Sequence, residues 1–364
     1  MSGKVVLEQL IPLMSPALRE VLAKVDCKMW DQVEEIRLRE DRPLMLNWTG
    51  GEVVLNRKGR VVSAKEAGQA CMVSREDIER TLQLISNCSL YAFEEELRRG
   101  YMTVPGGHRI GLCGKAVVEK GRIKLLHYVS SLNFRIAREI KGGGEKIIPY
   151  LVDKHKDASG AGYDTKRVMA GYGNGLAGAS PTGRRLTVSS GDHRIFHTLV
   201  ISPPQGGKTT LLRDLARCLS EGMPGKGISG FKIGLVDERS EIAGCYRGVP
   251  QMNVGTRTDV LDCAPKAEGM MMLLRSMSPE IIITDEIGRE EDADAIVEVI
   301  NAGITVIASA HAAHTGDLSR RPSLQKLLDQ KVFRRIVILG RSRGVGTVEK
   351  IIDPENKNKA VYGI

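Results

Sequence analysis

The stretch Ser202-Pro203-Pro204-Gln205-Gly206-Gly207-Lys208-Thr209-Thr210 decides the fold of this 364-residue chain. A loop ending in Gly-Gly-Lys-Thr can wrap its backbone N–H groups around phosphate oxygens, and it places an ammonium on the β/γ-phosphates and a hydroxyl on Mg²⁺. The general pattern begins with glycine where this chain has Ser202, but both glycines nearest the phosphates are present. We therefore expect the whole stretch to bind ATP, and Thr209 also to bind Mg²⁺.

The residues on either side of this loop have the pattern of a strand and a helix. Residues 196–201 are mostly apolar or β-branched, and residues 209–219 carry apolar side chains at helical spacing before Gly222. Strand, loop and helix therefore occur in the order that a phosphate loop requires. This order favours a phosphate loop over a chance glycine turn.

Further apolar runs alternate with helical patterns toward the C-terminus. The runs are Phe231–Val236, Ile281–Thr284, Ile304–Ser309 and Arg335–Leu339. Such alternation is typical of an α/β fold with a mostly parallel sheet that is covered by helices on both faces. Ligands of these sheets bind at the carboxyl ends of the strands. Several polar residues follow the predicted strands at these ends: Asp237, Glu238, Asp285, Glu286 and His311.

These polar residues can be assigned roles in phosphoryl transfer to water, which needs charge neutralisation, a metal and a positioned water. We expect Lys208 to pair with the β/γ-phosphates. Asp285 is the expected holder of the Mg²⁺ waters, and Glu286 is the candidate for orienting the attacking water. Adjacent acids after a strand can also cap a helix, but a phosphate loop in the same chain favours the catalytic interpretation.

Two further candidates have a structural alternative. Glu238 either shares the catalytic role with Glu286 or forms an ion pair with Arg239. His311 either senses the γ-phosphate through a hydrogen bond or is satisfied by neighbouring backbone. An arginine from another subunit or domain can also stabilise the transition state, and the sequence does not choose among the candidates. They are Arg213, Arg239, Arg257, Arg275, Arg37, Arg39, Arg109 and Arg135.

The sequence before the nucleotide-binding domain indicates two further segments. Residues 1–140 read as an α+β domain, with a helix over 5–23, a helix over 75–86 that Ser74 opens, and several short strands. The strands are expected at 33–39, 44–47, 52–55, 100–104, 109–113 and 116–119. Residues 141–194 are assigned to a flexible linker, because the glycine-rich part from 153 to about 193 lacks a sustained apolar period. Residues 195–364 are the nucleotide-binding domain.

Composition limits the other classes of function. The net charge of +9 and the pI of about 9.2 could indicate a surface for nucleic acid or for an anionic membrane. Charges of both signs are interspersed and aromatic residues are few, so a solvated, mildly basic surface is favoured over both. The cysteines show no metal-ligand spacing and are expected to be reduced: Cys27, Cys71, Cys88, Cys113, Cys218, Cys245 and Cys263. The absence of a signal segment and of a long apolar segment makes the cytoplasm the expected compartment, with peripheral membrane attachment left open.

Taken together, a set of motifs resembles the stage III sporulation protein AA family of endospore-forming bacteria. The motifs lie at 35–39, 42–44, 106–114, 201–214, 236–242 and 266–279, and the resemblance covers nearly the whole chain except the insertion. The family's loop is also similar in its Ser-Pro-Pro start. A wider resemblance is to the hexameric secretion and pilus-retraction ATPases, which have a RecA-like P-loop NTPase core after a sensing domain and a linker.

This resemblance implies a Mg²⁺-dependent ATP-hydrolysing motor that forms a homo-hexamer and acts with membrane-embedded channel proteins between mother cell and forespore. The acidic box, Walker B acid and histidine box of the relatives match Asp237-Glu238, Glu286 and His311. Those relatives commonly have glycine where this chain has Asp285, which leaves the division of roles between Asp285 and Glu286 open. The alternatives are a nucleic-acid-stimulated ATPase and a nucleotide-gated scaffold that does not hydrolyse.

Overall fold

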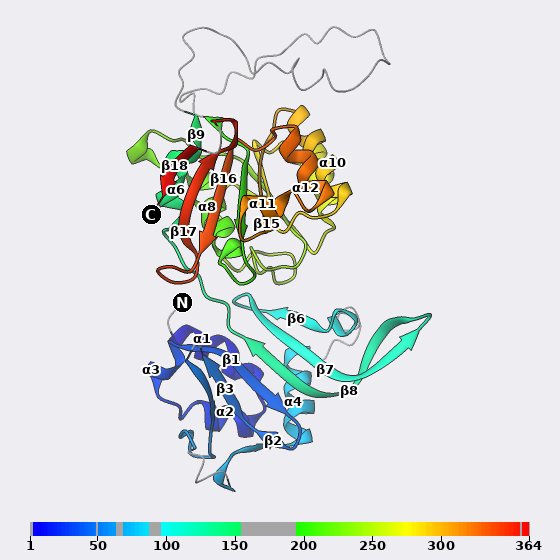
Figure 1. Cartoon of the computed structure of the whole chain (residues 1–364). Helices are drawn as coiled ribbons and strands as arrows, with labels where there is room; N and C mark the ends of the chain where they lie inside the picture. The colour runs from blue at the N-terminus through cyan, green and yellow to red at the C-terminus, as the bar shows by residue number, and fades with distance from the viewer. Residues whose placement is uncertain are drawn as a thin grey trace. The chain divides into compact units, whose positions relative to one another are not determined.

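The computed structural model describes residues 3–48, 50–62, 68–86, 96–153, 194–356 and 359–363 (Figure 1). The chain divides into two compact units. Unit 1 contains the chain up to Glu139 together with Gly244–Met252, and unit 2 contains Ile140–Ala243 and the residues from Asn253 onward. The expected flexible insertion lies largely in 154–193, outside the described residues, and stays a prediction. The first part of the expected linker forms helix α6, Gly143–Leu151, which belongs to unit 2.

Unit 1 is an α+β module, as the sequence predicts. Its antiparallel sheet has the order β4-β3-β1-β8-β7-β6. These strands are β1 Val33–Arg39, β3 Met45–Trp48, β4 Gly51–Val54, β6 Tyr101–Val104, β7 His108–Glu119 and β8 Arg122–Arg135. The other elements are α1 Gly3–Leu10, η1 Ile11–Leu13, α2 Pro16–Leu22, α3 Cys27–Trp30, α4 Arg75–Ile85 and the small pair β2 Arg42–Pro43 and β5 Met72–Val73. Trp30 and Phe134 are fully buried in the core of this unit.

The N-terminal part of unit 1 differs from the prediction in two places. The single helix expected over 5–23 is broken into α1, η1 and α2, because Pro16 starts a new helix and Ser15 caps it by accepting a hydrogen bond from the Leu18 N–H at 3.3 Å. The two strands expected over 109–119 are one strand, β7, with a bulge between Cys113 and Lys115. Its long partner β8 was not predicted. Helix α4 and its capping box, which joins Ser74 and Asp77, confirm the prediction.

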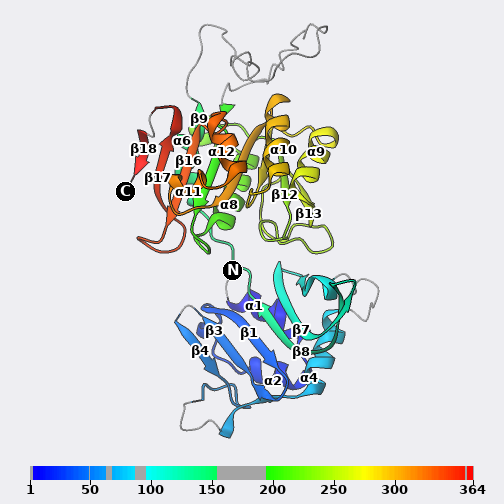
Figure 2. The same ribbon diagram turned by 45° about the vertical axis from the view of Figure 1, so that its right-hand side comes forward.

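Unit 2 has an eight-stranded sheet of order β13-β12-β14-β15-β11-β16-β17-β18. Its strands are β11 Thr198–Ser202, β12 Ile233–Asp237, β13 Thr258–Asp262, β14 Ile281–Thr284, β15 Thr305–His311, β16 Arg335–Gly340, β17 Thr347–Asp353 and β18 Lys359–Gly363. The strands from β13 to β16 are parallel, whereas β17 and β18 add an antiparallel edge (Figure 2). The mostly parallel sheet confirms the predicted fold class. The sequence reading missed β13, β17 and β18.

Helices cover both faces of the unit 2 sheet. The helices are α8 Lys208–Glu221, α9 Lys266–Ser276, α10 Glu290–Asn301, α11 Thr315–Leu318 and α12 Pro322–Asp329. Unit 2 also contains the short 3₁₀ helices η3 Pro224–Lys226 and η4 Pro354–Asn356, and the short strands β9 Val152–Asp153 and β10 Arg194–Ile195. One core joins α9, α10 and α12 to the side chains of alternate strand residues such as Leu199, Ile201 and Val236. Helix α8 packs on β11, β12, β14 and β15 without contributing to that core, so it covers the opposite face, and α6 packs against it.

Candidate nucleotide-binding site

The polar residues predicted to meet at the strand ends do lie at one edge of the unit 2 sheet. In register, Ser202 at the end of β11 pairs with His311 at the end of β15, and Thr284 at the end of β14 pairs with Ala308. Strand β12, which ends at Asp237, is the next parallel neighbour of β14. The carboxyl ends of four neighbouring strands therefore carry the candidate residues.

The loop between β11 and α8 has the backbone of a phosphate loop. Gly207 has a φ of +90° and forms the N-cap of α8, and Gln205 also lies in the left-handed region with φ +57°. A Cβ on Gly206 would lie 2.4 Å from the Ser202 Oγ and 2.9 Å from the Pro203 carbonyl oxygen, so no side chain fits there without movement. The loop thus presents backbone N–H groups at the N-terminus of α8, where the helix dipole favours an anion.

Lys208 begins a chain of contacts that crosses the site. Its side chain is buried, and its Nζ lies 2.8 Å from the Nδ1 of His311 and 3.3 Å from the Oγ of Ser202. The Nε2 of His311 lies 2.8 Å from the Glu286 Oε1. The other carboxylate oxygen of Glu286, Oε2, is 3.1 Å from a guanidinium nitrogen of Arg239. Three of the predicted catalytic residues are therefore directly connected.

The contacts also fix the tautomer of His311. An ammonium group has only donors, so the Nδ1 of His311 accepts from Lys208. The ring hydrogen is then on Nε2, which donates to the Glu286 carboxylate. Burial lowers the pKa of Lys208 below its usual value, and the nearby carboxylates of Glu286 and Asp285 act in the opposite direction. The alternative reading of His311 as a residue satisfied by backbone is wrong.

The backbone of Glu286 has an unusual conformation that the next strand maintains. Its φ is +42°, in the left-handed region that side-chain-bearing residues seldom adopt. Its N–H donates to the buried Ser309 Oγ at 3.0 Å, and the N–H of Ile287 donates to the Ser309 carbonyl oxygen at 2.8 Å. Ser309 therefore positions Glu286, a role that the sequence reading missed because a serine inside an apolar strand resembles a core residue. Strained backbone that its surroundings hold in place is often found at functional sites.

Asp285, which directly follows β14, is buried, and it lies next to Thr284, whose side chain also has an oxygen without a hydrogen-bond partner in the described part of the chain. The side chain is 2% exposed, and within the described residues neither its Oδ1 nor the Oγ1 of Thr284 has a hydrogen-bond partner. Burial, reinforced by the negative charge of Asp237, raises the pKa of Asp285 to about 7. A buried carboxylate oxygen that lacks a partner fits a role next to a hydrated cation.

The described side chains of the site suit a Mg²⁺ ion that is bound mainly by the phosphates of a nucleotide, and they do not form a metal site by themselves. Across the described ranges, no group of three or more His, Cys, Asp or Glu side chains is arranged to hold a metal, and the cysteines described there are free thiols. Mg²⁺ in such sites takes one or two protein ligands and completes its shell with phosphate oxygens and water. Thr209, in the first turn of α8, and Asp285 are the residues of the predicted set that suit this arrangement.

The two acids at the end of β12, Asp237 and Glu238, are both engaged by neighbouring groups of unit 2. Both oxygens of the buried Asp237 accept backbone hydrogen bonds, from the N–H groups of Glu241, Ile242 and Ala243 at 2.8–2.9 Å, so this carboxylate holds its own loop. Glu238 forms an ion pair with Lys266, a residue of α9 whose side chain is 8% exposed. Of the two alternatives for Glu238, the ion pair with Arg239 is wrong, because Arg239 binds Glu286 instead.

Several of the candidate arginines are used in bonds within their own unit. Arg213 donates to the carbonyl oxygens of Glu241 and Ile242, and Arg257 donates to that of Ser220. Arg37 pairs with Glu35, Arg135 lies 3.9 Å from the same carboxylate, and Arg109 lies over the ring of Tyr101.

An exposed arginine that sequence reasoning missed is bound to the phosphate loop. Arg341, just after β16, donates to the carbonyl oxygens of Pro204 and Gln205 at 3.2 and 3.3 Å. Only the folded structure brings this residue to the loop, because more than a hundred positions separate the two in the chain.

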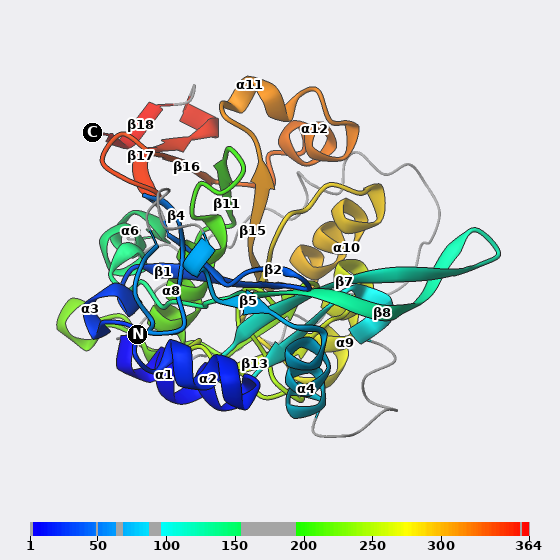
Figure 3. The same ribbon diagram turned by 90° about the horizontal axis from the view of Figure 1, so that it is seen from below.

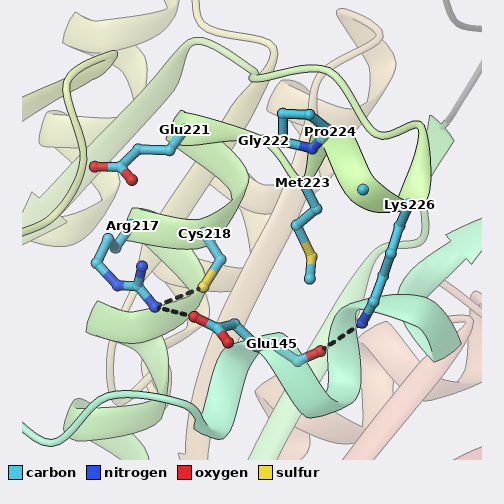
Figure 4. Close-up of a pocket in the computed structure, with 9 residues that line it drawn as sticks. Glu145, Arg217, Cys218, Glu221, Gly222, Met223, Pro224 and Lys226 are labelled. Carbon is cyan, nitrogen blue, oxygen red and sulfur yellow. Dashed lines mark hydrogen bonds and ion pairs between the residues drawn. The ribbon is translucent and has the colours of Figure 1, made fainter.

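A hollow lies at the C-terminal end of α8 (Figure 4). It has a volume of about 390 Å³ and is lined by residues of α6, the last turn of α8 and the segment up to Lys226. Three of its charged residues contact one another: the Arg217 Nη2 lies 3.0 Å from the Glu145 Oε1, and Lys226 donates to the Glu145 carbonyl oxygen at 3.3 Å. Because α8 is 14 residues long, about 20 Å of helix separates this hollow from the phosphate loop.

Comparison with known proteins identifies the family. The family model described as "Sporulation stage III, protein AA" matches residues 5–161 and 180–359. The chain is 41% identical over 349 residues to the stage III sporulation protein AA of Bacillus subtilis (strain 168), which covers 96% of each protein.

The chain belongs to the stage III sporulation protein AA family.

Part of this chain is also similar to a protein outside the stage III sporulation protein AA family. The uncharacterized protein ycf45 of Cyanidium caldarium is 34% identical over 135 residues, which cover 36% of this chain and 38% of that protein. Among solved structures, the pilus retraction motor PilT with bound ADP superposes with a TM-score of 0.50 at 11% identity, and the match covers 90% of this chain and 83% of PilT. This structure therefore has the same fold as the pilus retraction motor PilT. No helix in the described ranges is long and apolar enough to cross a membrane.

Proposed function

We propose that this family member is a Mg²⁺-dependent ATP-hydrolysing motor that works as a ring of six and energises a channel between mother cell and forespore. The observation that supports it best is the connected series Lys208–His311–Glu286, which stands directly beside the phosphate loop at the carboxyl ends of the strands. A phosphate-binding lysine linked through one histidine to a carboxylate gives the site both a binding group and a group that can orient water.

In this proposal the loop binds the triphosphate and the lysine neutralises its charge. The N–H groups around Gly206 and Gly207 would surround the β-phosphate, and the Lys208 ammonium would contact the β/γ-phosphates. The hydroxyl of Thr209 and, through water, the carboxylate of Asp285 would hold Mg²⁺, which supplies charge neutralisation at the phosphates when bound. The pKa of Asp285, about 7, then falls because a cation favours its charged form.

The contacts of Glu286 suggest how nucleotide binding prepares hydrolysis. Both of its carboxylate oxygens are bound, one to His311 and one to Arg239. A triphosphate that draws the Lys208 ammonium away leaves the Nδ1 of His311 without its donor. The His311 ring is then free to reorient toward the γ-phosphate, which releases one oxygen of Glu286 for the attacking water.

This geometry favours Glu286 over Glu238 as the principal catalytic acid. Glu286 is linked to the phosphate-binding lysine through a single side chain, whereas Glu238 is engaged by Lys266. Glu238 is proposed to anchor the loop after β12 to α9. Its removal should therefore lower stability more than it lowers the rate of the chemical step.

Steady-state ATPase measurements on the full chain test the proposal. Lys208→Ala should abolish both the binding of a fluorescent ATP analogue and turnover. Glu286→Gln should keep binding and reduce turnover about 100-fold or more, the usual contribution of a positioned acid or base. The matched control is Glu290→Gln, which changes an exposed glutamate in the first turn of α10. Equal turnover in all four proteins would refute the ATPase assignment.

Light scattering tests the ring. The proposal expects a mass of six chains with ATP and Mg²⁺, best trapped in Glu286→Gln, and a strict monomer at high protein concentration would count against it. Adding DNA or RNA to the same ATPase assay separates the nucleic-acid-stimulated alternative. That alternative expects higher turnover with a steep dependence on salt, whereas a channel motor expects no response.

A further inference from the structure

The two longest strands of unit 1 extend past the sheet to which they belong. On the sheet, β7 pairs with β6 as far as Gly111 and β8 pairs with β1 as far as Ser131. Beyond these positions, in the described residues, the pairing continues only between β7 and β8, from Lys115 opposite His127 to Glu119 opposite Arg122. We call residues 114–128 the arm. Figures 1 and 3 show it as a two-stranded ribbon that projects beyond the other strands of unit 1 and beyond α4.

One face of the arm is apolar and becomes uncovered toward its tip. Residues that pair directly in an antiparallel ribbon lie on the same face, which puts Ala116 and Leu126, and then Val118 and Ile123, on one side. Leu126 is half-buried against the core of unit 1, whereas Val118 and Ile123 are 60% and 51% exposed. Lys124 is an extra residue in β8, because Val117 pairs with Leu125 and Val118 pairs with Ile123. This bulge places Ile123 on the same face as Leu126, so the apolar strip is continuous.

The same ribbon is strongly basic. The arm contains four lysine or arginine residues and one glutamate, which gives a net charge of +3 with His127 neutral. They are Lys115, Lys120, Arg122, Lys124 and Glu119. The glutamate is itself paired with Lys124 at 2.7 Å. Tyr128, 68% exposed, stands at the base of the arm and adds an aromatic side chain of the kind that prefers a membrane interface.

We propose that the arm docks on an anionic lipid surface, with Val118 and Ile123 entering the boundary between headgroups and acyl chains and the basic side chains contacting lipid phosphates. Exposed aliphatic residues next to lysine and arginine are the composition of interfacial membrane anchors. Each basic residue near such a surface contributes about fivefold to binding. The docking uses no residue of the nucleotide site, so it is independent of the proposed ATPase activity.

Two other occupants fit the arm less well. Nucleic acid would use the basic residues, but it would leave Val118 and Ile123 in water, and a row of bases would find one tyrosine, Tyr128 at the base of the arm, on which to stack. A second copy of this chain would have to bring an acidic surface to a ribbon whose charge is +3, although the whole chain carries a net charge of +9. Both are outcomes of the test below.

Co-sedimentation of the full chain with vesicles tests the proposal. The wild type should pellet with vesicles that contain about one third phosphatidylglycerol in phosphatidylcholine at physiological salt, and should stay in solution with phosphatidylcholine alone. Val118→Ser/Ile123→Ser should lower the binding at least about tenfold, since it removes most of the exposed apolar surface of the tip. Lys120→Glu/Arg122→Glu should lower it further, because each change reverses a charge.

Matched variants control for general effects of surface mutation. Met272→Ser removes an apolar side chain of α9 that is 56% exposed, and Lys28→Glu/Lys58→Glu reverses two exposed charges of unit 1 outside the arm. Both should bind anionic vesicles like the wild type. ATP turnover should be the same in all these proteins, because none of the changed residues belongs to the nucleotide site.

A direct measurement of insertion does not depend on lost binding. Ile123→Trp should be quenched by lipids brominated on their acyl chains, whereas Lys58→Trp should not. The proposal is overturned if the wild type ignores anionic vesicles, if both arm variants bind like the wild type, or if the tryptophan at position 123 is not quenched. It is equally overturned if the arm variants lose RNA binding or molar mass while vesicle binding is kept.

Discussion

The buried carboxyl of Asp285 makes the stability of unit 2 depend on pH in a defined direction. Burial raises its folded pKa from 3.8 to about 7, so the folded state holds a proton that the unfolded chain releases near pH 4. A group of this kind contributes stability that is fully present below pH 4 and is lost as the pH rises through 7. Asp285→Asn places a neutral side chain there at every pH, so we expect this variant to be more stable than the wild type in neutral and basic solution.

The size of the effect follows from the shift. A difference of about three pKa units corresponds to roughly 4 kcal/mol when the group is fully ionised. Between pH 5 and pH 8 the wild type should therefore lose about 3 kcal/mol that Asp285→Asn keeps. Solvent screens this effect little, because the side chain is 2% exposed.

The assay can follow the two units separately. Both tryptophans of the chain, Trp30 and Trp48, belong to unit 1, so tryptophan fluorescence reports the unfolding of that unit. Far-ultraviolet circular dichroism adds the helices of unit 2, above all α8, α9 and α10. Urea titrations without nucleotide at pH 5 and pH 8 should show a later dichroism transition for Asp285→Asn at pH 8, with an unchanged fluorescence transition.

Two outcomes would refute this reasoning. If the advantage of Asp285→Asn is the same at pH 5 and pH 8, the carboxyl does not titrate between these values and is not held protonated by burial. If the variant is less stable than the wild type at pH 8, the ionised carboxylate has partners in the folded state that stabilise it. Asp259→Asn, at an exposed position of β13, is the control for the change itself.

Two other predictions concern positioning and packing. Ser309→Ala leaves the Glu286 N–H without its acceptor, and a lost hydrogen-bond partner of this kind costs about 1–3 kcal/mol. We expect kcat to fall severalfold or more while the affinity for nucleotide is kept. Ser309→Thr should restore kcat if the hydroxyl group is what positions Glu286. Phe134→Ala empties a fully buried position of unit 1 and should cost about 3–5 kcal/mol, seen as an earlier fluorescence transition; an unchanged transition would mean that the core refills the space.

The sequence predicted the phosphate loop and the meeting of the strand ends because both depend on local order. Residues 196–222 carry their strand, loop and helix signals within one short stretch. Parallel strands that alternate with helices must end at one edge, so the positions of Asp285, Glu286 and His311 followed from their places after apolar runs.

The partners of these residues could not be predicted in the same way. Lys266 reaches Glu238 from α9 across 28 positions, and Ser309 reaches Glu286 from the neighbouring strand. Such pairs depend on the order of strands in the sheet, which alternation alone leaves open. Strand β8 was missed for another reason: bulges in its pairing with β7 shift the register, and this interrupts the period-two pattern on which strand prediction rests.

The assignment of Gly244–Met252 to unit 1 has a practical consequence for dissecting this protein. The chain passes between the units at residues 139–140, 243–244 and 252–253, so one cut cannot separate them. A fragment that ends at Glu139 lacks the segment whose Gln251 Oε1 accepts a hydrogen bond from the Gly106 N–H at 3.0 Å. A fragment that starts at Ile140 carries this segment without its packing partners. We therefore expect the two isolated fragments to fold less stably than the intact protein. A fragment that contains unit 2 alone would need a short linker in place of residues 244–252.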